Sequence, residues 1–135
     1  MPIEFKYRRE RSSKGTFIFR PVAKVILKGE NGRQVVEYMY IDSGADFTVI
    51  PYQLGLYLGL KTKREHIDEV QGLNGVVSVI YTKVNLTIGK ESFPAKIAWA
   101  QIEQVPLLLG RTDIFDKFEI TFIQSKQKIL FEWTK

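Results

Sequence analysis

Apolar residues along this chain gather in short runs that are rich in β-branched and aromatic side chains. Runs of about four to eight such residues, bounded by turn-forming residues, are typical of β-strands. The predicted strands cover residues 16–19, 22–27, 35–41, 47–50, 76–81, 83–88, 93–100, 120–123 and 128–133. Many short strands at regular spacing predict an all-β fold, either a closed barrel or a sandwich.

Turn residues separate several of these strands. Residues 30–33 contain Asn31-Gly32, a pair that tolerates the positive φ angles of a tight type I′ hairpin. A second turn lies between β-prone arms and reads Gly72, Leu73, Asn74 and Gly75. This pattern predicts a flexible hairpin tip, which is either an ordinary surface hairpin or a lid that closes over an extended ligand.

Two segments favour short helices, residues 52–60 and residues 111–117. Gly55 and Gly59 weaken the first of them, because glycine is a poor helix former. No internal repeat or linker divides the 135 residues, and 44% hydrophobic content is enough for one well-filled core. We therefore expect one domain over residues 1–135.

Composition narrows the cellular setting of the protein. No apolar run approaches the roughly 20 residues that a membrane span requires. Residues 1–14 carry charges where a signal peptide would have its apolar stretch. The absence of cysteine removes disulfides and thiolate chemistry, and it fits a reducing compartment. These features predict a soluble, cytoplasmic protein without a membrane partner.

The formal net charge is +5, and a cluster of positive residues lies near the N-terminus, at Lys6, Arg8, Arg9, Arg11 and Lys14. Such a cluster can bind nucleic acid, or it can be a solvated edge or a loose terminus. No stacking-aromatic motif or recognition-helix pattern accompanies it. We therefore expect residues 1–15 to form an extended basic arm, and we do not expect a nucleic-acid partner.

His66 is the single histidine, and it lies in the polar run 61–69. One histidine without cysteine cannot build a two-histidine or thiolate metal site, and a solvated loop position fits it better than a catalytic triad. We expect no metal and no cofactor. If the chain is an enzyme, its acid–base chemistry falls to carboxylates.

A carboxylate on a tight turn is the main candidate for that chemistry. Asp42-Ser43-Gly44 follows one β-prone run and precedes another, so Asp42 is either exposed at a loop tip or held inside. A lone buried carboxylate costs several kcal/mol or binds a proton, and it therefore needs a partner. The triplet alone is weak evidence, because its three residue types are ordinary in turns.

A second motif follows downstream, where an apolar run ends in Gly110-Arg111. The run is either a core strand that stops or a neighbour of the Asp42 turn. If the two segments are neighbours, Arg111 can clamp Asp46 in a buried bidentate pair. Losing one member of such a pair costs about 3–5 kcal/mol.

Together, the D-S-G-A-D turn, the glycine-tipped hairpin and L-L-G-R before a short helix resemble the retroviral-type (retropepsin-like) aspartic proteases. The resemblance covers roughly residues 22–133. It implies a closed β-barrel of the acid-protease type with one or two short helices, working as a symmetric dimer. Two departures are that Ser43 replaces the commoner threonine and that the hairpin tip has only two glycines.

The resemblance also implies roles for individual residues. Asp42 becomes the catalytic aspartate, and Ser43 and Gly44 complete its triplet. The residues implied to bind substrate, four of them as a flap tip, are Ala45, Asp46, Gly72, Leu73, Asn74 and Gly75. Structural support for the active loop is implied for Leu108, Leu109, Gly110 and Arg111, with Arg111 paired to Asp46.

Aspartic proteolysis uses two carboxylates that share one proton, and this chain contains a single D-[ST]-G triplet. The second carboxylate must come from another copy, which a two-fold symmetric homodimer supplies. The predicted function is an aspartic endopeptidase that hydrolyses extended peptide or protein substrates. The alternatives are a catalytically silent retropepsin-fold module that binds peptides or dimerises, and a small basic β-barrel that binds nucleic acid.

Overall fold

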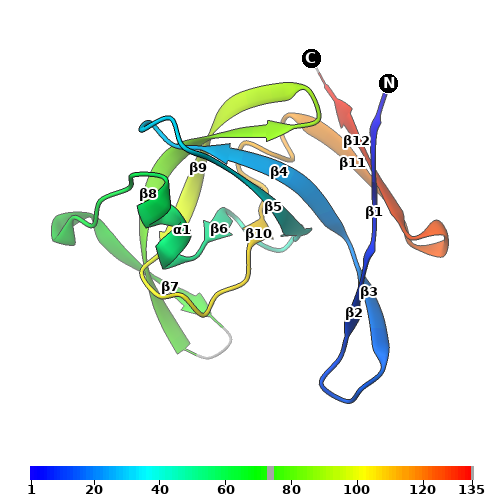
Figure 1. Cartoon of the computed structure of the whole chain (residues 1–135), viewed down its shortest axis with the longest axis horizontal. Helices are drawn as coiled ribbons and strands as arrows, with labels where there is room; N and C mark the ends of the chain where they lie inside the picture. Colours follow the sequence, from blue (N-terminus) through cyan, green and yellow to red (C-terminus); the bar gives the residue numbers. More distant parts are fainter. Residues whose placement is uncertain (73–74, 135) are drawn as a thin grey trace.

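The computed structural model describes residues 1–72 and 75–134, and most of these residues lie in β-strands (Figure 1). The strands are β1 (Ile3–Lys6), β2 (Arg8–Arg11), β3 (Phe17–Arg20), β4 (Val22–Lys28), β5 (Gln34–Ile41), β6 (Thr48–Ile50), β7 (Ile67–Gly72), β8 (Gly75–Ile88), β9 (Glu91–Ala100), β10 (Leu108–Leu109), β11 (Phe118–Ile123) and β12 (Lys128–Trp133). The helices are α1 (Tyr52–Tyr57) and the 3-10 turns η1 (Arg64–His66) and η2 (Gln124–Lys126).

Six strands close into a barrel, in the order β4-β5-β10-β6-β9-β8, because β8 also pairs with β4. The prediction of a closed β-barrel is therefore confirmed. Its interior is filled by apolar side chains from several strands, and Leu27, Met39, Ile97 and Trp99 are fully buried. β7 extends this sheet beyond the barrel by pairing with β8.

The first barrel hairpin forms where Asn31-Gly32 predicts it, but the predicted type I′ turn is wrong, because Gly32 has a positive φ and Asn31 does not. β4 and β5 pair in antiparallel register from Val22↔Tyr40 to Lys28↔Gln34, and Gly32 adopts a positive φ of 86° in the turn between them. This register brings the last residues of β5 to the barrel end from which the Asp42 turn leaves.

One of the two predicted helices is present. α1 is shorter than the predicted 52–60, because Gly59 leaves the helical region with a φ of 87°. Gly55 lies against Trp99, where an added Cβ would come 2.0 Å from the indole nitrogen. Within residues 1–72 and 75–134, no helix is long and apolar enough to cross a membrane.

The second predicted helix, 111–117, is wrong. This segment is a series of turns, and Asp113 breaks the helical path with a φ of 67°. The Asp113 carboxylate instead accepts a hydrogen bond of 2.9 Å from the backbone N–H of Lys96 on β9. The gain from that tertiary contact outweighs local helix propensity, which is a weak preference over so few residues.

The two ends of the chain lie together. β1 pairs with β12, and β12 pairs with β11, so a three-stranded antiparallel sheet carries both termini (Figure 1). β2 and β3 form a separate two-stranded hairpin that projects from the lower right of the barrel in this view. The basic N-terminal residues are therefore built into strands and do not form a loose terminus.

Candidate active site

The Asp42 turn follows directly from the end of β5. The backbone N–H of Asp42 donates to the Leu109 carbonyl at 3.0 Å, which ties the turn to β10. The Asp42 carboxylate accepts a 2.9 Å hydrogen bond from the N–H of Gly44, and the N–H of Ala45 donates to the Asp42 carbonyl at 3.2 Å. Asp42 is half-buried, so its carboxylate is held in a fixed orientation with part of its surface open to solvent.

β10 is the strand that fixes both sides of this turn. Leu108 lies opposite Tyr40 of β5 in parallel register and opposite Val49 of β6 in antiparallel register. β10 therefore lies between β5 and β6, and the turn that joins these two strands connects its two sides. Of the two readings that the sequence left open for this run, the structure shows the one in which residues 108–111 lie beside the Asp42 turn.

Gly110 is required by this close packing. A Cβ at this position would lie 2.4 Å from the carbonyl carbon and oxygen of Phe47. Backbone atoms cannot move aside as a flexible side chain can, so only glycine fits here. Gly44 has a milder constraint, because a Cβ there would lie 3.2 Å from the Asp42 carboxylate oxygen.

Thr48 is a supporting residue that the sequence analysis missed. Its side chain is completely buried, and its hydroxyl oxygen accepts a 3.0 Å hydrogen bond from the N–H of Gly110. The hydroxyl therefore satisfies a buried backbone donor that would otherwise have no partner. A polar residue inside the otherwise apolar run 47–50 was the available signal.

Arg111 and Asp46 form the predicted ion pair, but the predicted burial and bidentate geometry are wrong. One guanidinium nitrogen contacts the Asp46 carboxylate, and the other donates to the Ser43 carbonyl at 2.9 Å. The Arg111 and Asp46 side chains are 50% and 73% exposed. Because the turn lies at the barrel rim, Arg111 bridges two points of it and does not clamp one buried carboxylate.

Backbone contacts reinforce that bridge. The N–H of Arg111 donates to the Ala45 carbonyl and the N–H of Thr112 donates to the Asp46 carbonyl, both at 2.9 Å. The Ser43 hydroxyl, by contrast, is exposed and makes no hydrogen bond within residues 1–72 and 75–134. The chain therefore holds the turn through its backbone and through Arg111, and the triplet serine is free for other contacts.

The glycine-tipped hairpin forms from β7 and β8, which pair up to Gly72↔Gly75. Leu73 and Asn74, the other predicted tip residues, lie outside the described residues. The hairpin extends from the barrel at the lower left of Figure 1. Near its base, the Tyr81 ring packs against Phe47, which follows the Asp42 turn, at a centroid distance of 4.9 Å.

The pKa of the Tyr81 hydroxyl is raised by its surroundings. Burial raises the pKa of its hydroxyl, and the nearby Asp68 and Asp46 carboxylates raise this pKa further. Lys96 lies 5.4 Å from the centre of the Tyr81 ring and 5.4 Å from that of Phe47. The Asp46 side of the turn is thus joined to the base of the hairpin by an aromatic and charged cluster.

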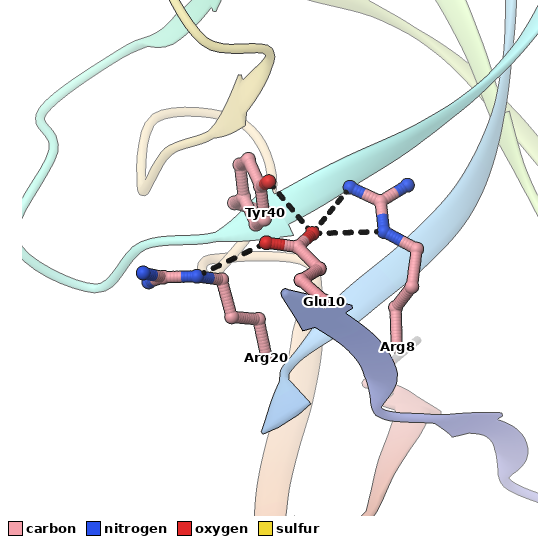
Figure 2. A network of polar contacts seen from close by, with 4 residues as sticks. All are labelled: Arg8, Glu10, Arg20 and Tyr40. Atoms are coloured by element: carbon pink, nitrogen blue, oxygen red, sulfur yellow. Dashed lines mark hydrogen bonds and ion pairs between the residues drawn. The ribbon is translucent and has the colours of Figure 1, made fainter. Parts of the chain in front are cut away.

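A second network, missed by the sequence analysis, lies just before the turn (Figure 2). The Tyr40 hydroxyl donates to the Glu10 carboxylate at 2.7 Å, and this carboxylate also pairs with Arg8 at 2.9 Å and with Arg20 at 3.2 Å. Burial opposes ionisation of Glu10, but hydrogen bonds from Tyr40 and Arg8, with the charges of Arg8 and Arg20, hold its carboxyl pKa below the ordinary value. The network ties the β2–β3 hairpin to β5, two residues before Asp42.

The chain matches the aspartyl protease family over residues 23–112, and it belongs to that family. Among solved structures, it is similar to a retropepsin-like aspartic protease from Rickettsia conorii, with a TM-score of 0.65 and 16% identity over 96% of this chain and 98% of that one. It is also similar to EIAV protease in complex with the inhibitor HBY-793, with a TM-score of 0.55 and 22% identity over 72% of this chain and 86% of that one. A comparison with curated proteins finds no significant match.

These likenesses give the class of the protein as a retropepsin-like fold of the aspartyl protease family. The matched region contains the Asp42 turn and ends just beyond Arg111, so it includes both sequence motifs that meet around β10. The resemblance expected from the sequence is therefore confirmed.

Proposed function

We propose that this protein is an aspartic endopeptidase that acts as a symmetric homodimer, with one Asp42 carboxylate from each chain. The supporting observation is the fixed, half-buried Asp42 on a turn that β10 holds from both sides. Asp46, the next carboxylate along the turn, is engaged by Arg111 and does not serve as the second acid.

In the proposed reaction, the two Asp42 carboxylates share one proton and hold a water molecule between them. The ionised carboxylate takes a proton from this water as the water oxygen attacks the peptide carbonyl carbon. The protonated carboxyl donates its proton to the carbonyl oxygen. In the resulting tetrahedral intermediate, the carboxyl that accepted the water proton gives it to the leaving nitrogen as the C–N bond breaks. One hydroxyl of the intermediate at the same time returns its proton to the other, now ionised, Asp42 carboxylate, which restores the shared proton.

The substrate would bind as an extended strand between the turn and the β7–β8 hairpin. The carbonyls of Ala45 and Asp46 already accept hydrogen bonds from Arg111 and Thr112. The Asp46 N–H has no partner in the described part of the chain, so it is a backbone donor that the turn can offer to a peptide. Gly72 to Gly75 would cover the peptide as a flap and exclude water.

Replacing Asp42 by asparagine tests this proposal. Asp42→Asn removes the base and the shared proton while keeping the shape of the side chain, so peptide hydrolysis should fall by at least about 10²–10⁴-fold. Cleavage of a peptide library, followed by mass spectrometry, measures the loss, and sedimentation velocity checks that the dimer persists.

Asp116→Asn is the matched control, because Asp116 is exposed and lies outside the turn. This variant should keep full activity. Undiminished cleavage by Asp42→Asn would overturn the assignment. A wild-type protein that binds extended peptides but never cleaves them would instead support the catalytically silent module.

A further inference from the structure

The β2–β3 hairpin has two different faces. Its register pairs Arg8 with Arg20, Arg9 with Phe19, Glu10 with Ile18 and Arg11 with Phe17. Residues directly opposite each other point to the same side of an antiparallel pair, and side chains alternate along each strand. The inner face therefore carries Arg8, Glu10, Ile18 and Arg20, and the outer face carries Arg9, Arg11, Phe17 and Phe19.

The inner face already has its partner within the chain. Figure 2 shows Arg8, Arg20 and Tyr40 of β5 gathered around the Glu10 carboxylate. The Arg8 and Arg20 guanidiniums also lie 5.3 Å and 5.9 Å from the centre of the Tyr40 ring. These contacts fix the side on which the hairpin packs against the barrel, and they turn the other face away from it.

The outer face combines exposed aromatic rings with arginines. Phe17 is 51% exposed and Phe19 is 39% exposed. Arg9 and Arg11 both lie over the Phe17 ring, at 4.4 Å and 5.0 Å from its centre. Exposed aromatic side chains with arginine are the composition that marks the buried centre of a protein–protein interface.

The position of the hairpin identifies the partner that reaches this face. Its root is tied to Tyr40, and the N–H of Ile41 donates to the Pro21 carbonyl at 3.1 Å. Two residues of extended chain span about 7 Å, so the root lies within that distance of Asp42 along β5. A second copy that brings its own Asp42 to about 3 Å from this one therefore comes close to the root of the hairpin.

We propose that the outer face of the β2–β3 hairpin packs against the second copy of the chain in the homodimer. This inference rests on the proposed function, which places the two Asp42 turns together. Charge complementarity supports a copy of the same chain as the partner, because exposed carboxylates occur on and just before β7, at Glu65, Asp68 and Glu69. The β7–β8 hairpin and the β2–β3 hairpin both project toward the bottom of Figure 1.

The test compares substitutions on the two faces of β3. The double variant Phe17→Ser/Phe19→Ser should raise the dimer dissociation constant about a hundredfold. Each half-exposed ring that loses its burial at the interface accounts for about tenfold.

The matched control is Ile18→Ser, which removes a 38% exposed apolar side chain from the same strand on the inner face. It should change the constant by about threefold or less. Sedimentation equilibrium over a concentration series measures each constant, and far-UV circular dichroism checks folding.

Peptidase activity separates the possible results. Activity of the double variant that is lost in dilute solution and returns at high protein concentration supports the inference. A double variant with the wild-type dissociation constant overturns it, and intact cleavage in that protein leaves the proposed function standing. An unchanged dissociation constant with a raised KM would show that substrate covers this face, which also overturns the inference. A wild-type protein that is monomeric and cleaves peptides would overturn both proposals.

Arg9→Glu is a second variant that keeps both rings. Because it places a negative charge on the outer face, it should weaken the dimer and also reduce the dependence of the dissociation constant on salt. The same constant and salt dependence as the wild type would contradict the predicted pairing with carboxylates of the second copy.

Discussion

The Asp42 turn and the root of the β2–β3 hairpin both lie at the end of β5, but they are held by different kinds of contact. The turn is fixed by backbone hydrogen bonds to residues 109–112 and by glycines at its tightest points. The hairpin is fixed to the barrel mainly by the side chains of Arg8, Glu10, Arg20 and Tyr40. Backbone packing gives a geometry that few substitutions can adjust, whereas a surface network of side chains can open without disturbing the barrel.

This difference fits the roles that we propose for the two regions. A catalytic carboxylate must be held within a fraction of an ångström, and the barrel provides that rigidity. A hairpin that packs against a second copy needs only a defined root and an exposed face. Substitutions in the two regions should therefore differ in their effect on the free energy of unfolding.

The largest effect on folding is expected for Gly110→Ala. The added methyl group would overlap the Phe47 backbone at 2.4 Å, so the turn or β10 must shift, and the free energy of unfolding should fall by about 3 kcal/mol. Guanidinium denaturation measures the loss. Gly32→Ala is the control, because its φ of 86° strains alanine but no atom lies within 4 Å, and about 1 kcal/mol is expected there. Equal losses would remove the argument for backbone contact at Gly110.

A smaller effect is expected for Arg111→Ala. An exposed ion pair contributes at most about 1 kcal/mol, and the hydrogen bond to the Ser43 carbonyl adds about 1 kcal/mol more. The free energy of unfolding should therefore fall by about 1–2 kcal/mol when measured in dilute, monomeric protein. Arg111→Lys keeps the charge but loses the two-pronged contact, so it should recover only part of the loss. A loss of about 3–5 kcal/mol would show that this pair is energetically like a buried one.

The smallest effect on global stability is expected for Glu10→Gln, which should alter the hairpin alone. Because the network lowers the pKa of Glu10, it favours the ionised carboxyl. Its contribution is therefore present above the ordinary pKa of glutamate and is lost as the pH falls through the lowered value. Hydrogen exchange of the β2 and β3 amides should show this loss in the wild type. In Glu10→Gln the carboxyl step should be absent, and a persistent step would assign the pH dependence to another group.

Much of the fold and of the site could be predicted because the signals were local. Asn31-Gly32 predicts its hairpin, since turn formation depends on a few adjacent residues, and Gly32 does adopt the positive φ that glycine favours. The Asp42 triplet and Gly110-Arg111 were recognised as neighbours because each motif has a specific residue order. The pair of Arg111 with Asp46 followed from opposite charge, but its exposure did not, because burial depends on where the barrel ends.

Other features had a weak local signal or a misleading one. Residues 111–117 read as a helix, and only the contact between Asp113 and the Lys96 backbone explains why they form turns. Thr48 gave a weak signal in its own strand, and its role depends on Gly110, which lies 62 residues away. The basic residues at the N-terminus read as a solvated arm, because nothing nearby in sequence reveals that Glu10 meets Tyr40.

The sequence by itself determined the family, most of the barrel strands and the residue order of the Asp42 turn, since these depend on side-chain pattern and on backbone freedom over a few residues. It did not predict β1, β2, β7 or β10 as strands. Only the tertiary structure decided that β10 lies between β5 and β6, that the Arg111 pair is exposed and that the basic segment is a two-faced hairpin beside the turn. The physical reason is that strand pairing and burial are set by the packing of the whole barrel, and local preferences of about 1 kcal/mol are readily overridden by it.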